Sequence, residues 1–332
     1  MWYKTMIGGA IALAVWTISA SPAAAHDWLF KLHGWPFAPV WGEAKLVGPG
    51  ENGISKPGVN DGCPHETADG LSLLIASNRE DPNDIWAADR ASIKDPWSEP
   101  RKLEAPVNSA AGDFCPTPVR GRSLLFVSTR PGACPGEVAG GGDIYLSRQS
   151  PAGGWSEPVH LGCAPNGPNT AGGERSPSLI ETPYGTFLFY SSNGNMTDGL
   201  VAAGADQDIY VSIMRKDGTF GPGRRIEALS TPGFHDLMPN VRERYEGGYE
   251  IVFSSNRPTS PLGPAPKGDQ DVYMSFAWFL PGPWTPPINL GAAVNTNGTE
   301  QRATMSRDGK RLYFGRTPVG GTSDIYMSER KR

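Results

Sequence analysis

Five carboxylates stand at equivalent places along this chain, each three residues before a proline or, in the last case, before an alanine. They are Asp61, Asp113, Glu174, Asp236 and Glu300. Carboxyl groups brought together from several strands can act as general acid and base on a glycosidic bond. Their oxygens can equally hold a hard cation such as Ca²⁺. Which chemistry is open to them depends on the elements that position them.

A short phrase, an Asp followed by a β-branched residue and an aromatic one, returns five times at intervals of roughly 50 to 65 residues. The copies begin at Asp84, Asp143, Asp208, Asp271 and Asp324. An apolar run such as Leu73–Ser77 comes before each phrase, and in four units an aromatic-led segment such as Trp97–Pro100 comes after it. Short apolar runs bounded by Gly, Pro, Asn and Asp are typical of strands. We therefore predict units of four strands, named a, b, c and d in chain order.

The first and last units complete each other. The fifth unit ends at Arg332 without its aromatic-led strand, whereas Trp41–Leu46 supplies such a strand ahead of any complete unit. Joining the two halves closes a ring and removes the exposed sheet edges of a linear array. The sequence predicts an all-β, five-bladed β-propeller over residues 41–332, closed by an N-terminal strand that completes the last blade.

These repeats resemble the TolB-type, WD40-like propeller repeats of bacterial envelope proteins. The closest copy is Ser306–Phe314 followed by the phrase at Asp324, and Trp155–Pro158 matches the segment between repeats. The resemblance covers nearly all of residues 41–332 and implies a propeller fold. TolB itself has six blades and a separate N-terminal domain, so its role in an envelope complex is not carried over.

The first 25 residues are predicted to be a signal peptide. Lys4 precedes the apolar run 6–18, and small residues follow up to Ala25, the expected cleavage point. A retained N-terminal anchor is the alternative. Residues 26–40 then form a lead-in, no later segment is apolar enough to cross a bilayer, and the mature protein is expected in the periplasm or outside the cell.

Export makes the four cysteines interpretable, because an even number in an oxidising compartment favours disulfides. Cys134 and Cys163 belong to the same end of one unit and form the favoured pair. Cys63 and Cys115 hold the same place in neighbouring units and could bridge two adjacent inner strands. The rival interpretation makes Cys63, Cys115 and His65 metal ligands.

The candidate site lies where strand a begins, because strand a of a propeller lines the central channel. Alternation along a strand would point the acid and the residues two and four further on in one direction. The longest loops between strands b and c, at 131–142, 193–207 and 258–270, would form a rim around this mouth. The candidate ligand-binding residues are Asp61, His65, Asp113, Glu174, Asp236, Glu300 and Arg302.

A structural role for the acids is the competing interpretation. Four units carry an arginine at the end of strand b that could pair with the acid: Arg79, Arg130, Arg257 and Arg316. The third unit has Asn193-Gly194 instead. Without a compensating charge, burial would raise the pKa of Glu174.

Two functions follow. The first is a binding scaffold for an envelope or extracellular protein or a glycan, held at the loop-rimmed mouth. The alternative is a glycoside hydrolase similar to five-bladed arabinanases, a resemblance that implies Asp61 as base, Asp113 as orienting residue and Glu174 as acid. Neither requires a cofactor, although Ca²⁺ in the channel stays open. The formal net charge of −4 and the absence of a basic stripe argue against nucleic acid as a partner.

Overall fold

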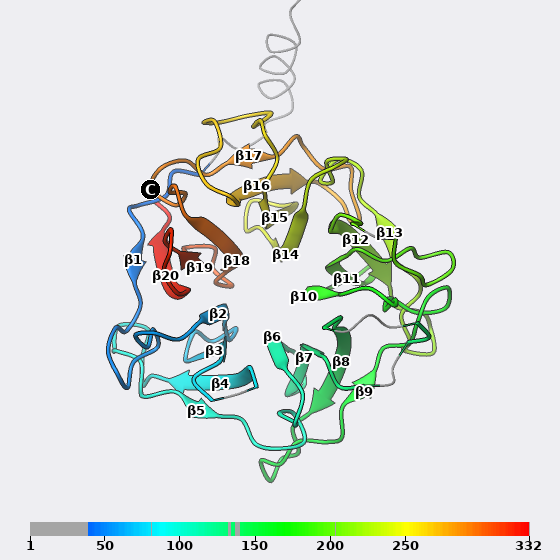
Figure 1. The fold of residues 1–332 in the computed structure, drawn as a ribbon, viewed down its shortest axis with the longest axis horizontal. Coiled ribbons are helices and arrows are strands. Elements are labelled where there is room, and N and C mark those ends of the chain that lie inside the picture. Colours follow the sequence, from blue (N-terminus) through cyan, green and yellow to red (C-terminus); the bar gives the residue numbers. More distant parts are fainter. Residues whose placement is uncertain (1–38, 81, 132–133, 137–139, 203, 332) are drawn as a thin grey trace, which may run out of the picture. The chain divides into compact units, whose positions relative to one another are not determined.

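The computed structural model describes residues 39–331, apart from residues 81, 132–133, 137–139 and 203. Val40–Arg332 form one compact unit, in which five four-stranded antiparallel sheets surround a central axis (Figure 1). This confirms the predicted all-β, five-bladed propeller. The described residues include no helix, and hence none that could cross a membrane. The predicted signal peptide lies outside the described residues.

Each blade runs outward from the strand nearest the axis. The strands are, in blade 1, β2 (Asp61–Glu66), β3 (Ser72–Ser77), β4 (Asp84–Asp89) and β5 (Arg101–Lys102); in blade 2, β6 (Asp113–Val119), β7 (Ser123–Ser128), β8 (Asp143–Arg148) and β9 (Val159–His160); in blade 3, β10 (Arg175–Thr182), β11 (Gly185–Ser192), β12 (Asp208–Ile213) and β13 (Arg224–Arg225); in blade 4, β14 (Asp236–Glu243), β15 (Tyr249–Ser255), β16 (Asp271–Ala277) and β17 (Ile288–Asn289); and in blade 5, β18 (Thr299–Met305), β19 (Arg311–Thr317), β20 (Asp324–Glu329) and β1 (Lys45–Leu46).

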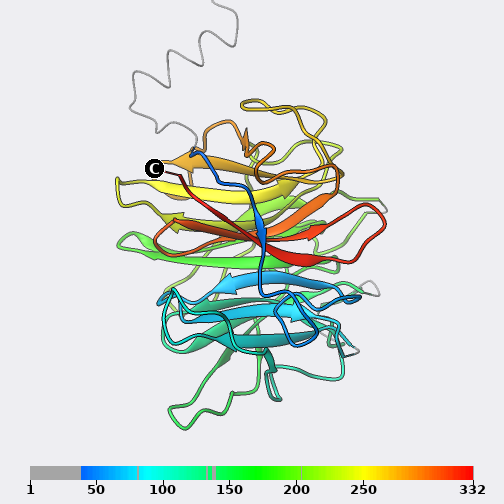
Figure 2. The same cartoon turned by 90° about the vertical axis from the view of Figure 1, so that its left-hand side faces the viewer.

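The N-terminal strand closes the ring as predicted. β1 pairs antiparallel with β20, with Leu46 opposite Tyr326, and Figure 2 shows the blue β1 crossing beside the red β20. Four residues before β1 begins, Trp41 forms a bridge with Arg330, and Trp41 is only 3% exposed. Blade 5 is therefore built from both ends of the propeller unit.

A repeated backbone hydrogen bond joins each blade to the next. The amide of the acid at the start of each inner strand, or next to it, donates to the carbonyl of the residue just before the Asp phrase of the preceding blade. The N···O distances are 2.8 Å for Asp61–Ser323, 2.8 Å for Asp113–Asn83, 2.7 Å for Glu174–Gly142, 2.8 Å for Asp236–Gln207 and 2.9 Å for Glu300–Gln270. Apolar clusters between the blades, such as the one that packs Phe189 of blade 3 against Trp284 of blade 4, complete the core.

All five inner strands contain a β-bulge, and this corrects the alternation argument. In blade 1, Gly62 pairs with Ala76 but His65 pairs with Leu74, so one extra residue is inserted. The bulged residues have left-handed φ angles between 43° and 59°: Cys63, Cys115, Ser176, Met238 and Arg302. Because of the insertion, the acid and the residue four further on lie on opposite faces of the blade. The prediction that they point the same way is wrong.

Closure can be tested at Trp41. We expect Trp41→Ala to lower the free energy of unfolding by about 3 kcal/mol, because it removes a buried indole from the closing blade. The neighbouring Val40 is 62% exposed, so Val40→Ala should change it by less than about 0.5 kcal/mol. Urea unfolding of both variants measures the difference. Equal effects would show that Trp41 does not hold the closing strand.

Candidate functional site

Four of the five acids form closed hydrogen-bond networks with an arginine of their own blade. Asp113, fully buried, accepts hydrogen bonds at 2.7 Å from the backbone N–H and the hydroxyl of Ser109, and at 2.8 Å from Arg130. The corresponding arginine–carboxylate distances are 2.8 Å for Arg79–Asp61, 2.5 Å for Arg257–Asp236 and 2.8 Å for Arg316–Glu300. The predicted pairing within each blade is confirmed.

Each arginine also binds the loop that enters its blade. Arg130, for example, donates to the carbonyl of Val107 at 2.8 Å, so it links the inner strand, the second strand and the entering loop. None of the five acids lines the central channel cavity. A ligand would have to break a charge-assisted network to reach Asp61, Asp113, Asp236 or Glu300. Their role in ligand binding therefore stays a prediction.

Glu174 of blade 3 is held differently. Its carboxylate accepts hydrogen bonds from the backbone N–H and the hydroxyl of Thr170, at 3.1 and 2.8 Å, and from the Ser192 hydroxyl at 2.6 Å. In blades 1, 2 and 4 the arginine lies two residues after the end of the second strand, and in blade 3 this position is Gly194. Any side chain at Gly194 would collide with the Thr170 hydroxyl. Two neutral hydroxyls thus replace a guanidinium.

This substitution changes the protonation of Glu174. Burial, together with the nearby charge of Asp143, raises the pKa of Glu174 to about 8, and the hydrogen bonds from Ser192 and Thr170 offset only part of that rise. The predicted upward shift is confirmed. Glu174 therefore carries its proton at neutral pH, as a general acid must, yet its side chain is fully buried.

The central channel is narrow. Its cavity measures about 20 Å³ and is lined by bulge residues and the residues that follow them, among them His65, Asn240 and Arg302. Burial lowers the pKa of His65 to about 4, so this ring is neutral at pH 7. The cavity has room for about one water molecule and not for a sugar ring. Ca²⁺ in the channel stays a prediction, and no carboxylate lines this cavity to bind it.

The favoured Cys134–Cys163 disulfide is confirmed, and the Cys63–Cys115 bridge, which the sequence left open, is also present. Cys63 bonds to Cys115 and thereby joins the inner strands of blades 1 and 2. Because neither sulfur remains as a thiolate, the interpretation of Cys63, Cys115 and His65 as metal ligands is wrong.

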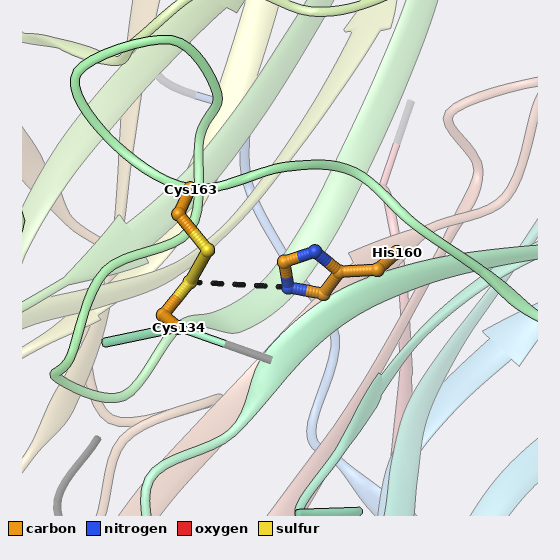
Figure 3. Close-up of side chains that lie close together, drawn as sticks. All are labelled: Cys134, His160 and Cys163. Atoms are coloured by element: carbon orange, nitrogen blue, oxygen red, sulfur yellow. Dashed lines mark hydrogen bonds between the residues drawn. A yellow bond between two sulfur atoms is a disulfide. The ribbon is translucent and has the colours of Figure 1, made fainter. Parts of the chain in front are cut away.

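Cys134 bonds to Cys163, and Figure 3 shows His160 beside this bridge, with Nε2 4.0 Å from the Cys134 sulfur. These three side chains are close enough to suggest a metal centre, but the two sulfurs are bonded to each other. His160 instead lies 3.1 Å from the carboxylate of Asp143, and its Nδ1 accepts the N–H of Gly162 at 3.1 Å. The cluster is therefore structural.

A much larger cavity, of about 1120 Å³, opens at the opposite mouth of the propeller, where the turns between first and second strands meet. We call this cavity the turn-side funnel. Its basic residues are Arg101, Lys102, Arg120, Arg122, Arg242, Arg244 and Arg307. Its acidic residues are Glu104, Glu181 and Glu243. Trp155 and the largely exposed Tyr245 add aromatic rings. The sequence instead predicts a ligand at the other mouth of the channel, where the inner strands begin.

Seven basic and three acidic residues line the turn-side funnel, although the formal net charge of the whole chain is −4. Arg242 and Arg244 are close to the buried Glu250, at 2.5 and 3.9 Å, but no ion pair involves Arg122 or Arg307 among the residues that the structure describes. The sequence carried a signal for this site in Arg120-Gly121-Arg122 and Arg242-Glu243-Arg244-Tyr245. Basic and aromatic residues in turns that converge on one axis form a surface suited to anionic ligands.

The contrast between blades 3 and 5 gives a pH test. In the unfolded chain the Glu174 pKa returns to about 4.5, so its stabilising contribution is complete below that pH and is lost as the pH rises towards 8. We expect parental stability relative to Glu174→Gln to fall by up to about 4 kcal/mol between pH 4.5 and 8. Glu300→Gln should instead cost about 3 kcal/mol at pH 7, because it leaves Arg316 unpaired. Urea unfolding across this range checks both, and parallel profiles for the parent and Glu174→Gln would show Glu174 ionised at neutral pH.

No family model matches the chain, and no curated protein matches it closely enough to count as a relative. Solved structures do share its fold. The endo-arabinanase from Bacillus licheniformis has a TM-score of 0.54 at 12% identity, covering 83% of this chain and 95% of that one. The α-L-arabinofuranosidase from Lactobacillus brevis has a TM-score of 0.53 at 13% identity, covering 82% of this chain and 90% of that one. The endo-arabinase from Bacteroides thetaiotaomicron also has a TM-score of 0.53 at 13% identity, covering 87% of this chain and 98% of that one. At these identities the likeness shows a five-bladed propeller, and the TolB-type assignment stays a prediction.

Proposed function

We propose that this protein is an exported propeller that acts on a glycan, and that it holds the glycan in the turn-side funnel. The observation that carries the proposal is this cavity of about 1120 Å³, with its basic side chains and two aromatic rings. The central channel has room for little more than one water molecule, so the funnel is the described cavity that fits a ligand of several sugar rings. Two disulfides are consistent with a periplasmic or secreted location.

The lining suits a glycan that carries acidic groups. Arginine side chains bind carboxylates through two parallel hydrogen bonds, and Arg122 and Arg307 are not committed to ion pairs within the described chain. The flat faces of Trp155 and Tyr245 can pack against the apolar face of a sugar ring. Large aromatic surfaces with a few polar groups are typical of ligand pockets.

The structural neighbours support a glycan over a protein as the ligand, because their names describe enzymes of arabinose-containing glycans. They also favour the hydrolase alternative over a passive scaffold. One feature of this chain agrees with hydrolysis, which is the proton that Glu174 keeps at neutral pH. Hydrolysis by the inner-strand acids would need the glycan at the opposite mouth from the turn-side funnel, with Glu174 as acid, Asp61 as base and Asp113 to orient the acid, so it is a second candidate function with a site of its own. All three are buried, so the reaction needs the loop at Thr170 to move away from Glu174.

Ligand binding can be tested by calorimetry with a panel of acidic and neutral polysaccharides. We expect an acidic polysaccharide to bind, and the double variant Arg122→Ala/Arg307→Ala to weaken binding at least tenfold, because each arginine contributes roughly 1 kcal/mol or more of charge-assisted hydrogen bonding. Lys267→Ala is the matched control, since it removes an exposed charge from the 258–270 loop at the opposite mouth. Loss of binding in Lys267→Ala alone would place the ligand at that mouth instead.

Hydrolysis has a separate readout, the release of new reducing ends from the same panel. If Glu174 is the acid, Glu174→Gln should keep the fold and lose turnover by roughly 10²-fold or more. A parent protein that binds a polysaccharide but releases no product would leave binding as the function. Equal product release by the parent and a folded Glu174→Gln would remove Glu174 from the reaction.

A further inference from the structure

Arg302 is a basic residue that lines the narrow central channel. It is the bulge residue of β18, with φ 58°, and its side chain is among those that line the cavity. Its guanidinium reaches blade 1 and rests on Gly62, where any Cβ would collide with Nη1. Glycine at position 62 therefore makes the space that this side chain occupies.

The charge of Arg302 has no counter-charge within the described chain. No ion pair there involves Arg302, and its Nε has no hydrogen-bond partner. The carboxylate two residues earlier, Glu300, is already engaged by Thr296 and Arg316. No acidic residue lines the channel cavity. A guanidinium in a narrow channel without a counter-charge is costly, and a bound anion would offset that cost.

Other groups around the cavity are also hydrogen-bond donors. The Asn240 side-chain oxygen accepts the N–H of Met305 at 2.9 Å, which leaves its NH₂ group for another partner. Among the described residues, the hydrogen-bond partner of the Ser176 hydroxyl is the sulfur of Cys115, a weak acceptor, at 3.2 Å. Neutral His65 has one ring N–H. Burial and then the charge of Arg175 lower the pKa of Arg302 to about 10, which shows that a second guanidinium adds positive potential here.

We propose that the channel binds one small anion of about the size of chloride, held by the guanidinium of Arg302 and by the donors of Asn240, Ser176 and His65. The cavity of about 20 Å³ admits one water-sized particle, so it excludes sulfate, phosphate and sugar carboxylates. The site is separate from the turn-side funnel and does not depend on the proposed glycan. The anion neutralises the channel where five inner strands converge, so its binding stabilises the ring.

The test compares sodium chloride and sodium bromide with sodium gluconate at one ionic strength, because gluconate is too large for the cavity. We expect the Tm of the parent to rise by roughly 2–4 °C, saturably, with either halide. Arg302→Met keeps the length of the side chain without its charge and should abolish the halide response while raising Tm in gluconate. Arg224→Met, which removes an exposed charge from β13, should respond like the parent.

Equal Tm values for the parent in all three salts would overturn the proposal and leave water as the occupant. A halide response that persists in Arg302→Met would also overturn it, because the anion would then bind elsewhere. If Arg302→Met fails to fold, parental crystals grown in bromide decide the matter by anomalous scattering. A bromide peak within hydrogen-bond distance of the Arg302 guanidinium supports the site, and its absence at saturating bromide overturns it.

Discussion

The hydrogen bonds of the carboxylate residue at or next to the start of each inner strand are the constraint on which the rest of the propeller depends. The amide of this residue donates to the preceding blade, and the side chain binds the loop that enters its own blade. In four blades an arginine at or just after the end of the second strand completes the network. A single residue thus joins two blades and three segments. Removing one member of such a buried, charge-assisted network strongly destabilises the fold, because the remaining charge is left without a partner.

The acid–arginine networks also determine which of the five acids are available for chemistry. Four acids are fully committed to arginines, so the groups that would be expected to perform chemistry are the groups that hold the strands. Blade 3 departs from the rule, since Gly194 and two hydroxyls replace the arginine, and Glu174 keeps a proton there. The bulge residue that follows each acid lines the central channel, whose cavity is narrow, whereas the large cavity lies at the other mouth.

Much of this architecture could be predicted from the residues. The Asp phrases and apolar runs indicate five blades, and the unmatched halves at Trp41 and Asp324 indicate how the ring closes. The acid–arginine spacing predicts the ion pairs and the exception at Glu174. Strict alternation failed because a bulge adds a residue without any change in hydrophobic pattern. The turn-side funnel was missed because Arg122 and Arg307, far apart in the chain, become neighbours of one cavity only when the ring closes.

The closing strand has a consequence for how the molecule is assembled. Leu46 finds its partner Tyr326 only after nearly the whole propeller has been synthesised. Such a contact has a high loop-closure cost, so the ring is expected to form late and slowly compared with the local hairpins. The ladder between β1 and β20 has two residue pairs, and the Trp41–Arg330 bridge extends the same seam. The same seam brings two distant stretches of chain side by side, so a circularly permuted protein could be joined there and opened between any two other blades without interrupting a sheet.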